Sequence, residues 1–320
     1  MAEYRSFLAP LIADFVYYRE ASGCWNESSY EPNLVLFDRH CARRFPQASS
    51  LTQEMVDGWC ARRATETPNS CRSRIYVVVA LVRYLRARGL ADVAEPEIPA
   101  RERLAYVPHA FTDAELARFF HACDTIPAAP ATPERRSRRI TVPVFFRLLY
   151  SSGLRTCEAR LLRVGDADLD QGVLSVRDSK GPGQHYVALH PSMTELMRLY
   201  DAAISLQFPG RAYFFPANGK TGRHPRGWVQ RNFKQMWRSA SAAPAVAYQL
   251  RHHYAVVNIN RWVGQGLGFD AELLHLSRSM GHATVASTRA YYSLVPAIGD
   301  VIEDLTGVGF DQIVPEVPNG

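Results

Sequence analysis

The 320-residue sequence has very little lysine, no paired cysteine motif and no long hydrophobic run. Lys180, Lys220 and Lys234 are its three lysines, and the other 34 basic residues are arginine, so a lysine at a particular place is unusually informative. The six cysteines form no CxxC pair, which argues against a zinc site or a disulfide framework and favours a reducing cytoplasm. The most apolar run, 75–82, is far shorter than the ~20 residues of a membrane helix. No membrane partner is therefore expected.

Charge and length narrow the function classes further. Charged residues make up 21% of the chain, and 37 basic against 31 acidic residues give a formal net charge of +6. This balance favours a polyanionic partner such as nucleic acid. The N-terminus lacks the basic and then apolar order of a signal peptide, so a cytoplasmic protein is expected. At about 100–200 residues per domain, the length predicts two domains, and 47% apolar residues are enough to give each a core.

Helical periodicity and a proline-rich stretch divide the chain. Apolar residues recur at three and four positions through residues 1–94, which predicts a bundle of four or five helices. Three prolines among alternating charges at 95–108 are typical of an extended linker. A second domain is therefore expected at 109–295, followed by a tail at 296–320.

The second domain mixes two periodicities. A long helix is expected from Pro143 to Leu162, whereas residues 173–176 and 185–189 alternate like two strands around a turn that contains Lys180. Helical spacing returns in five later segments, namely 193–206, 229–239, 248–263, 271–280 and 285–292. The predicted fold class is therefore mostly α with a small antiparallel β-sheet.

Four local features of the second domain carry possible chemistry. Arg155 follows a glycine break and precedes the carboxylate of Glu158 by three residues. Lys180 stands at the tip of the predicted hairpin. Arg251 lies in the segment YQLRHHYA, and Tyr291 follows a glycine–histidine pair by nine residues. Each feature alone is common in proteins, but the ordered set of four is specific.

In this order the features resemble the catalytic domain of the tyrosine recombinases, also called the phage integrase family. The segment YSSGLRTCEARLLRVGD at 150–166 resembles the arginine box of that family, LRHHYA at 250–255 its second box, and MGHATVASTRAYY at 280–292 its third. The similarity covers about residues 111–293, and the helical first domain is similar in size and pattern to the family's core-binding domain. The resemblance implies a two-domain, site-specific DNA recombinase that cleaves and rejoins strands through a 3′-phosphotyrosine intermediate. It further implies integration, excision, transposition or resolution of a mobile element.

The resemblance also implies catalytic roles for five residues. Arg155 and Arg251 would grip the scissile phosphate, and Lys180 would protonate the leaving 5′ oxygen. His282 would contact the phosphate, and Tyr291 would be the nucleophile. The residue types suit this chemistry, because guanidinium groups stabilise charge on phosphate oxygens without a metal and a phosphotyrosine conserves the bond energy. No cofactor and no metal site are expected.

One position departs from the family pattern. Tyr248 stands three residues before Arg251, where the family most often has a histidine. A phenol is a poorer base near neutral pH, so either tolerated activity or a modest loss is expected, and Tyr248 could still donate a hydrogen bond to the phosphate. Tyr291 and Tyr292 are adjacent, and their spacing from the glycine–histidine pair selects Tyr291. On a helix the two side chains point about 100° apart.

Arginines clustered on a predicted helix of the first domain and in a short segment of the second are the candidates for contact with the DNA backbone, since phosphate contacts fix position and carry salt dependence. The candidates are Arg72, Arg74, Arg83 and Arg86 in the first domain and Arg136, Arg138 and Arg139 in the second. The implied partner is double-stranded DNA with specific recombination sites, bound by a tetramer that would be associated with the nucleoid. The tail at 296–320 could dock onto a neighbouring protomer or pack on its own domain.

Two other functions fit parts of the sequence. A type IB topoisomerase uses a similar residue set to relax DNA without exchanging partners. A catalytically impaired relative that only binds DNA would be consistent with Tyr248. Reaction products separate the three functions, because they are joined sites, relaxed circles, or a bound complex without a covalent adduct.

Overall fold

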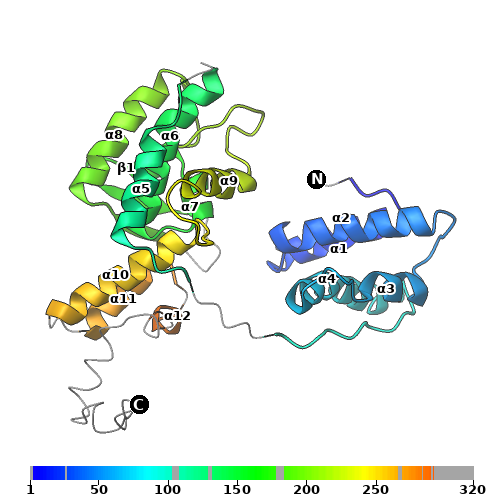
Figure 1. Ribbon diagram of the computed structural model, residues 1–320. Coiled ribbons are helices and arrows are strands. Elements are labelled where there is room, and N and C mark those ends of the chain that lie inside the picture. Colours follow the sequence, from blue (N-terminus) through cyan, green and yellow to red (C-terminus); the bar gives the residue numbers. More distant parts are fainter. Residues whose placement is uncertain are drawn as a thin grey trace, which may run out of the picture. The chain divides into compact units, whose positions relative to one another are not determined.

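The computed structural model of the chain describes residues 3–25, 27–102, 108–128, 132–177, 184–265, 269–282, 284–289 and 291. The chain divides into two compact units, Met1–Tyr106 and Val107–Gly320 (Figure 1). The division falls near the end of the proline-rich stretch at 95–108.

The first unit contains four helices in its described part. They are α1 (Ala9–Ala21), α2 (Glu27–Arg44), α3 (Gln53–Cys60) and α4 (Pro68–Arg86). The α4 helix begins with Pro68 in its first turn, and the Thr67 side chain caps it by accepting a hydrogen bond from the amide of Ser70. Its buried side packs against Phe15 of α1 and Phe37 of α2 in one apolar cluster. None of the helices in the described ranges of either unit is long and apolar enough to cross a membrane.

The second unit is helical around a small sheet. Its elements are α5 (Asp113–Asp124), α6 (Pro133–Ser152), α7 (Thr156–Leu161), the 3-10 turn η1 (Val164–Asp166), β1 (Ala167–Asp168), β2 (Val173–Val176), β3 (His185–Ala188), α8 (Pro191–Ser205), α9 (Arg226–Trp237), α10 (Gln249–Gln265), α11 (Phe269–Ser279) and α12 (Ala286–Arg289). The strands pair antiparallel in the order β1-β2-β3, with Val173 opposite Ala188. The predicted fold class is confirmed, although the short β1 strand is not among the predicted elements.

The prediction of one helix from Pro143 to Leu162 is wrong. The segment forms two helices, and the break between them places Arg155. Helix α6 begins ten residues earlier at Pro133, because Thr132 caps it and proline is favoured in the first turn. It ends at Gly153, whose φ is +65°. A Cβ atom there would clash with the Tyr254 ring, so the left-handed backbone and the close approach both require glycine. The chain restarts as α7, with Arg155 at its N-cap.

Acidification is expected to destabilise the second unit through His224, which lies in the loop before α9. The His224 ring stacks on Trp228 with ring centroids 3.9 Å apart. The backbone carbonyl of His224 accepts a 2.7 Å hydrogen bond from buried Arg160. Burial and the charge of Arg160 lower the pKa of His224 from 6.5 to about 4. Between these values the unfolded chain binds more protons, so the free energy of unfolding decreases as the pH falls, by up to ~1.4 kcal/mol per pH unit.

Thermal unfolding at pH 7 and pH 5 would measure this effect in the wild type and in His224→Gln. The variant is expected to lose less stability than the wild type over this interval. An equal loss in both proteins would contradict the assignment to His224.

Candidate active site

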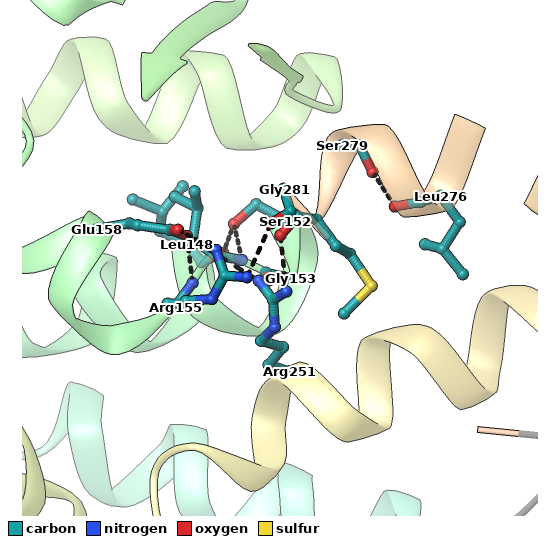
Figure 2. Close-up of polar contacts among 11 residues, drawn as sticks. Leu148, Ser152, Gly153, Arg155, Glu158, Arg251, Leu276, Ser279 and Gly281 are labelled. Carbon is teal, nitrogen blue, oxygen red and sulfur yellow. Dashed lines mark hydrogen bonds and ion pairs between the residues drawn. The ribbon is translucent and has the colours of Figure 1, made fainter. Parts of the chain in front are cut away.

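The second arginine of the predicted set is buried at the start of α10. Arg251 is 1% exposed. Its Nη1 donates a 2.6 Å hydrogen bond to the carbonyl of Gly153, and its Nη2 donates a 2.6 Å bond to the carbonyl of Met280 (Figure 2). Three segments far apart in the sequence therefore meet at one guanidinium group. Burial, and then the charge of Arg155, lower the pKa of Arg251.

Arg155 approaches the same place from the N-cap of α7. Its Nη2 donates a 2.8 Å hydrogen bond to the carbonyl of Gly281. Its Nη1 lies 2.6 Å from Oε1 of Glu158, whose Oε2 accepts a 2.7 Å bond from the Arg155 amide. The Glu158 side chain is completely buried and also lies 3.9 Å from Nη1 of Arg251. One carboxylate thus orients the first arginine and offsets the charge of both (Figure 2).

A glycine turn after α11 supplies the carbonyls that hold the two arginines. Gly281 has φ +62°, and a Cβ atom at this residue would lie 2.6 Å from the ring of His185 on β3. Only glycine fits the backbone conformation and the space together. The carbonyls of Met280 and Gly281 accept from Arg251 and Arg155 respectively. The turn therefore links the third sequence box to the first and second.

His282 follows this turn and is held by a threonine. Its Nδ1 lies 2.6 Å from Oγ1 of Thr288, which is fully buried. When the threonine hydroxyl donates to Nδ1, the neutral imidazole carries its hydrogen on Nε2, which is then a donor. Burial, followed by the charges of Arg251 and Arg155, lowers the pKa of His282 to about 4. The ring is therefore neutral at pH 7.

Tyr291 lies against this group of residues and is 7% exposed. Its ring is nearly parallel to that of His282, with centroids 6.2 Å apart, and is 5.4 Å from the ring of His252. Burial raises the pKa of the phenol, while the charge and hydrogen bond of Arg251 lower it. The phenol is thus protonated at neutral pH beside a permanently charged donor.

The structure brings Arg155, Arg251, His282 and Tyr291 together. Of the other two predicted catalytic residues, one lies outside the described residues and the other is more exposed than these four. Lys180 lies outside the described residues, which stop at Arg177 and resume at Gln184. Tyr248 immediately precedes α10 and is 41% exposed, and its ring lies 5.2 Å from that of His252.

Three further residues of the site have no role predicted from the sequence. Thr288 holds His282, His252 adjoins Tyr291, and buried His185 packs under Gly281. Neither ring nitrogen of His185 has a hydrogen-bond partner within the described parts of the chain. Two of these residues could have been found from the sequence, because His252 is next to Arg251 and Thr288 is three residues before Tyr291. Nothing in the sequence marks His185, which lies on a predicted strand.

The basic side chains predicted to contact DNA in the first unit divide into two groups. Arg74 is buried, and its guanidinium binds both carboxylate oxygens of Glu66, at 2.8 and 2.6 Å. A guanidinium fixed in this way cannot reach a phosphate, so the expectation for Arg74 is corrected to a structural role. Arg72 donates to the carbonyl of Pro99, the exposed Arg83 pairs with Glu95, and Arg86 is exposed.

In the second unit the three candidates are neighbours on α6. Arg136 and Arg139 are exposed, whereas Arg138 is half-buried. Arg138 donates a 2.6 Å hydrogen bond to Asn232 and a 2.8 Å bond to Gln235, both on α9. These contacts tie Arg138 to the protein, while the two exposed arginines remain suitable for a phosphate.

The arrangement is suited to a phosphoryl group. Two planar cations from different segments, a neutral histidine and a phenol converge, which are the groups needed to stabilise charge on phosphate oxygens and to attack phosphorus. Within the described ranges no three histidine, cysteine or carboxylate side chains group as metal ligands would.

Comparison with known sequences agrees with the geometry. Residues 109–296 match the profile described as the phage integrase family. A 198-residue stretch is 31% identical to y4rE of Sinorhizobium fredii, a protein provisionally named an integrase/recombinase, and covers 60% of this chain and 61% of that protein. A longer match, 26% identical over 303 residues, covers 90% of this chain and 92% of the tyrosine recombinase XerD of Bradyrhizobium diazoefficiens.

Solved structures share the fold at low identity. The XerH site-specific recombinase in a pre-cleavage complex with its difH substrate matches with a TM-score of 0.57 at 17% identity, over 83% of this chain and 76% of that one. A lambda integrase tetramer bound to a Holliday junction matches with a TM-score of 0.56 at 13% identity, over 89% and 76%.

Proposed function

The chain belongs to the phage integrase family, and from that premise we propose that it is a tyrosine-type site-specific recombinase that breaks and rejoins DNA strands. The observation that carries the proposal is the burial of Tyr291 beside Arg251 and His282. Burying a phenol and a guanidinium together costs free energy, so such a pair indicates a functional role. An anion bound by the arginines would lie next to this phenol.

In the proposed reaction the Tyr291 oxygen attacks the scissile phosphorus and forms a 3′-phosphotyrosine, and the bond from phosphorus to the 5′ oxygen breaks. Arg155 and Arg251 neutralise the charge that develops on the non-bridging oxygens. His282 donates from Nε2 to the same phosphate, and Lys180 protonates the departing 5′ oxygen. Attack by a 5′ hydroxyl of another strand reverses the step and joins the strands.

Tyr248 has a secondary role in this proposal. The exposed Tyr248 residue lies just before the N-terminal end of α10, three residues before Arg251. A hydrogen bond from this hydroxyl to the phosphate would explain why the residue is polar. The reaction needs no metal or other cofactor, because the cations that the phosphate requires are supplied by the protein.

We further propose double-stranded DNA with specific recombination sites as the partner of both units. The first unit, with the linker at 95–108, would be the core-binding domain, and Arg72, Arg83, Arg86, Arg136 and Arg139 would contact phosphates. Two sites exchanging strands require four active subunits, so the assembly on DNA would be a homo-tetramer. Its biological reaction would be the integration, excision or resolution of a mobile element, in the cytoplasm and on the nucleoid.

Trapping on a nicked suicide substrate tests this function. DNA that carries the sequences flanking the gene is incubated with the wild type or Tyr291→Phe in a chelating buffer, and the products are separated on a denaturing gel. A slow-moving covalent adduct is expected with the wild type and none with Tyr291→Phe, because the variant lacks only the attacking oxygen. DNA binding without an adduct in the wild type would instead indicate a DNA-binding protein. On a supercoiled plasmid that carries the same sequences, relaxed circles without joined sites would indicate a topoisomerase.

A further inference from the structure

Attack by Tyr291 requires a base that the roles above do not supply. Burial raises the pKa of the phenol, so the proton must leave as the oxygen attacks. Arg251, whose charge lowers the pKa of the phenol, is a permanent cation and cannot accept a proton. In the proposed reaction Lys180 protonates the departing 5′ oxygen, which lies on the side of the phosphorus opposite to Tyr291. Some other side chain near the Tyr291 ring must therefore take the proton.

The described side chains around Tyr291 differ in their ability to accept the phenolic proton. The side chains that interact with it include Arg155, Tyr248, Arg251, His252 and His282. The two arginines carry a charge already, and a phenol such as that of Tyr248 is a poor proton acceptor near pH 7. Among these groups the two imidazoles remain, since an imidazole is the ordinary proton acceptor at this pH.

The contacts of the two histidines distinguish their roles. His282 uses Nδ1 in its 2.6 Å contact with Thr288 and lies in the field of both arginines, so an added proton is strongly opposed there. His252 lies 5.4 Å from the Tyr291 ring at an interplanar angle of 55° and 5.2 Å from the ring of Tyr248. Its pKa is also lowered, by burial and by Arg251, so its imidazole is neutral. An added proton meets the charge of one arginine there, against two at His282.

We propose that His252 is the base that accepts the phenolic proton of Tyr291, an inference that rests on the recombinase function above. A ring nitrogen of His252 takes the proton while the Tyr291 oxygen bonds to phosphorus and the 5′ oxygen leaves with a proton from Lys180. When a 5′ hydroxyl later attacks the phosphotyrosine, its proton returns to the neutral Lys180 amine as its oxygen bonds to phosphorus. The bond between phosphorus and the Tyr291 oxygen breaks, and the His252 imidazolium returns its proton to the phenolate. The net charge of the site is unchanged in the intermediate, because Lys180 has given up a proton while His252 has gained one.

The local chain supports this pairing. His252 directly follows Arg251 in the first turn of α10, so the same backbone that fixes the buried guanidinium also fixes the imidazole. The next residue, His253, points elsewhere, because it packs on Tyr150 with ring centroids 5.5 Å apart and on Phe111 at 5.8 Å. Adjacent histidines with different neighbours provide a matched pair for mutation.

Single-turnover adduct formation on the nicked substrate, measured from pH 6 to 9.5, tests the proposal. His252→Gln is expected to slow the wild-type rate by about 100-fold or more at pH 7, as for loss of a general base. The deficit should shrink toward high pH, where hydroxide can remove the proton. His253→Gln, the matched control, should retain a rate within about threefold of the wild type. Gel-shift binding of the same DNA checks that each variant is folded.

A substrate with sulfur in place of the leaving 5′ oxygen identifies which proton His252 handles, because a thiolate leaves without protonation. This substrate should rescue Lys180→Ala and leave His252→Gln slow. Rescue of His252→Gln, or a wild-type rate and pH profile in that variant, would overturn the proposal while the function stands. Absence of an adduct in the wild type would overturn the function and this inference with it.

Discussion

Arg251→Lys is expected to lower the rate of covalent adduct formation by about 1,000-fold while DNA binding is largely retained. The guanidinium reaches the carbonyls of Gly153 and Met280 with two different nitrogens, and its charge lowers the pKa of Tyr291. A lysine ammonium is a single point charge, and it cannot keep both carbonyls paired while facing a phosphate. Loss of one preorganised donor to a developing anion typically costs ~100–1,000-fold in rate.

The control for this change is Arg147→Lys, which alters another arginine that binds through two nitrogens. Arg147 contacts both carboxylate oxygens of Asp124 at 2.7 Å on an exposed surface. This variant should therefore form the adduct at the wild-type rate. An Arg251→Lys protein with an unchanged rate would show that the buried guanidinium is only structural.

Glu158→Ala is expected to lower the free energy of unfolding of the second unit by about 3–5 kcal/mol. The carboxylate is completely buried, accepts from the Arg155 side chain and amide and lies 3.9 Å from Arg251. Without it, two guanidinium groups face each other in the interior with no negative charge between them. Chemical denaturation of the wild type and the variant would measure the difference.

An exposed pair with the same sequence spacing provides the comparison. Arg198 and Glu195 are three residues apart on α8 and 3.3 Å apart in space, and about half of each side chain is exposed. Glu195→Ala should therefore change the free energy of unfolding by at most about 1 kcal/mol. Equal effects of the two substitutions would show that Glu158 does not act as a buried counter-charge.

The sequence boxes indicate which side chains form the candidate site, but they do not indicate which backbone groups hold those side chains in place. Arg155, Arg251, His282 and Tyr291 can be chosen because side-chain type and order are written directly in the sequence. The Met280 and Gly281 carbonyls that hold the arginines cannot, because any residue has a carbonyl and only the tertiary fold decides where it points.

The errors have the same physical origin. Proline prefers the first turn of a helix, yet α6 carries Pro143 in its interior. The helical spacing of Arg74 favours a surface charge, yet Glu66 pairs with it inside the first unit. In both cases a local preference is overridden by packing and pairing with residues that periodicity does not reveal.

The most direct test of the account is to identify the amino acid that carries the DNA. The adduct trapped on the suicide substrate would be digested with protease and nuclease, and the nucleotide-bearing peptide located by tandem mass spectrometry. The account predicts a phosphodiester on Tyr291. A nucleotide on Tyr292 or Tyr248, or on any residue other than Tyr291, would contradict it.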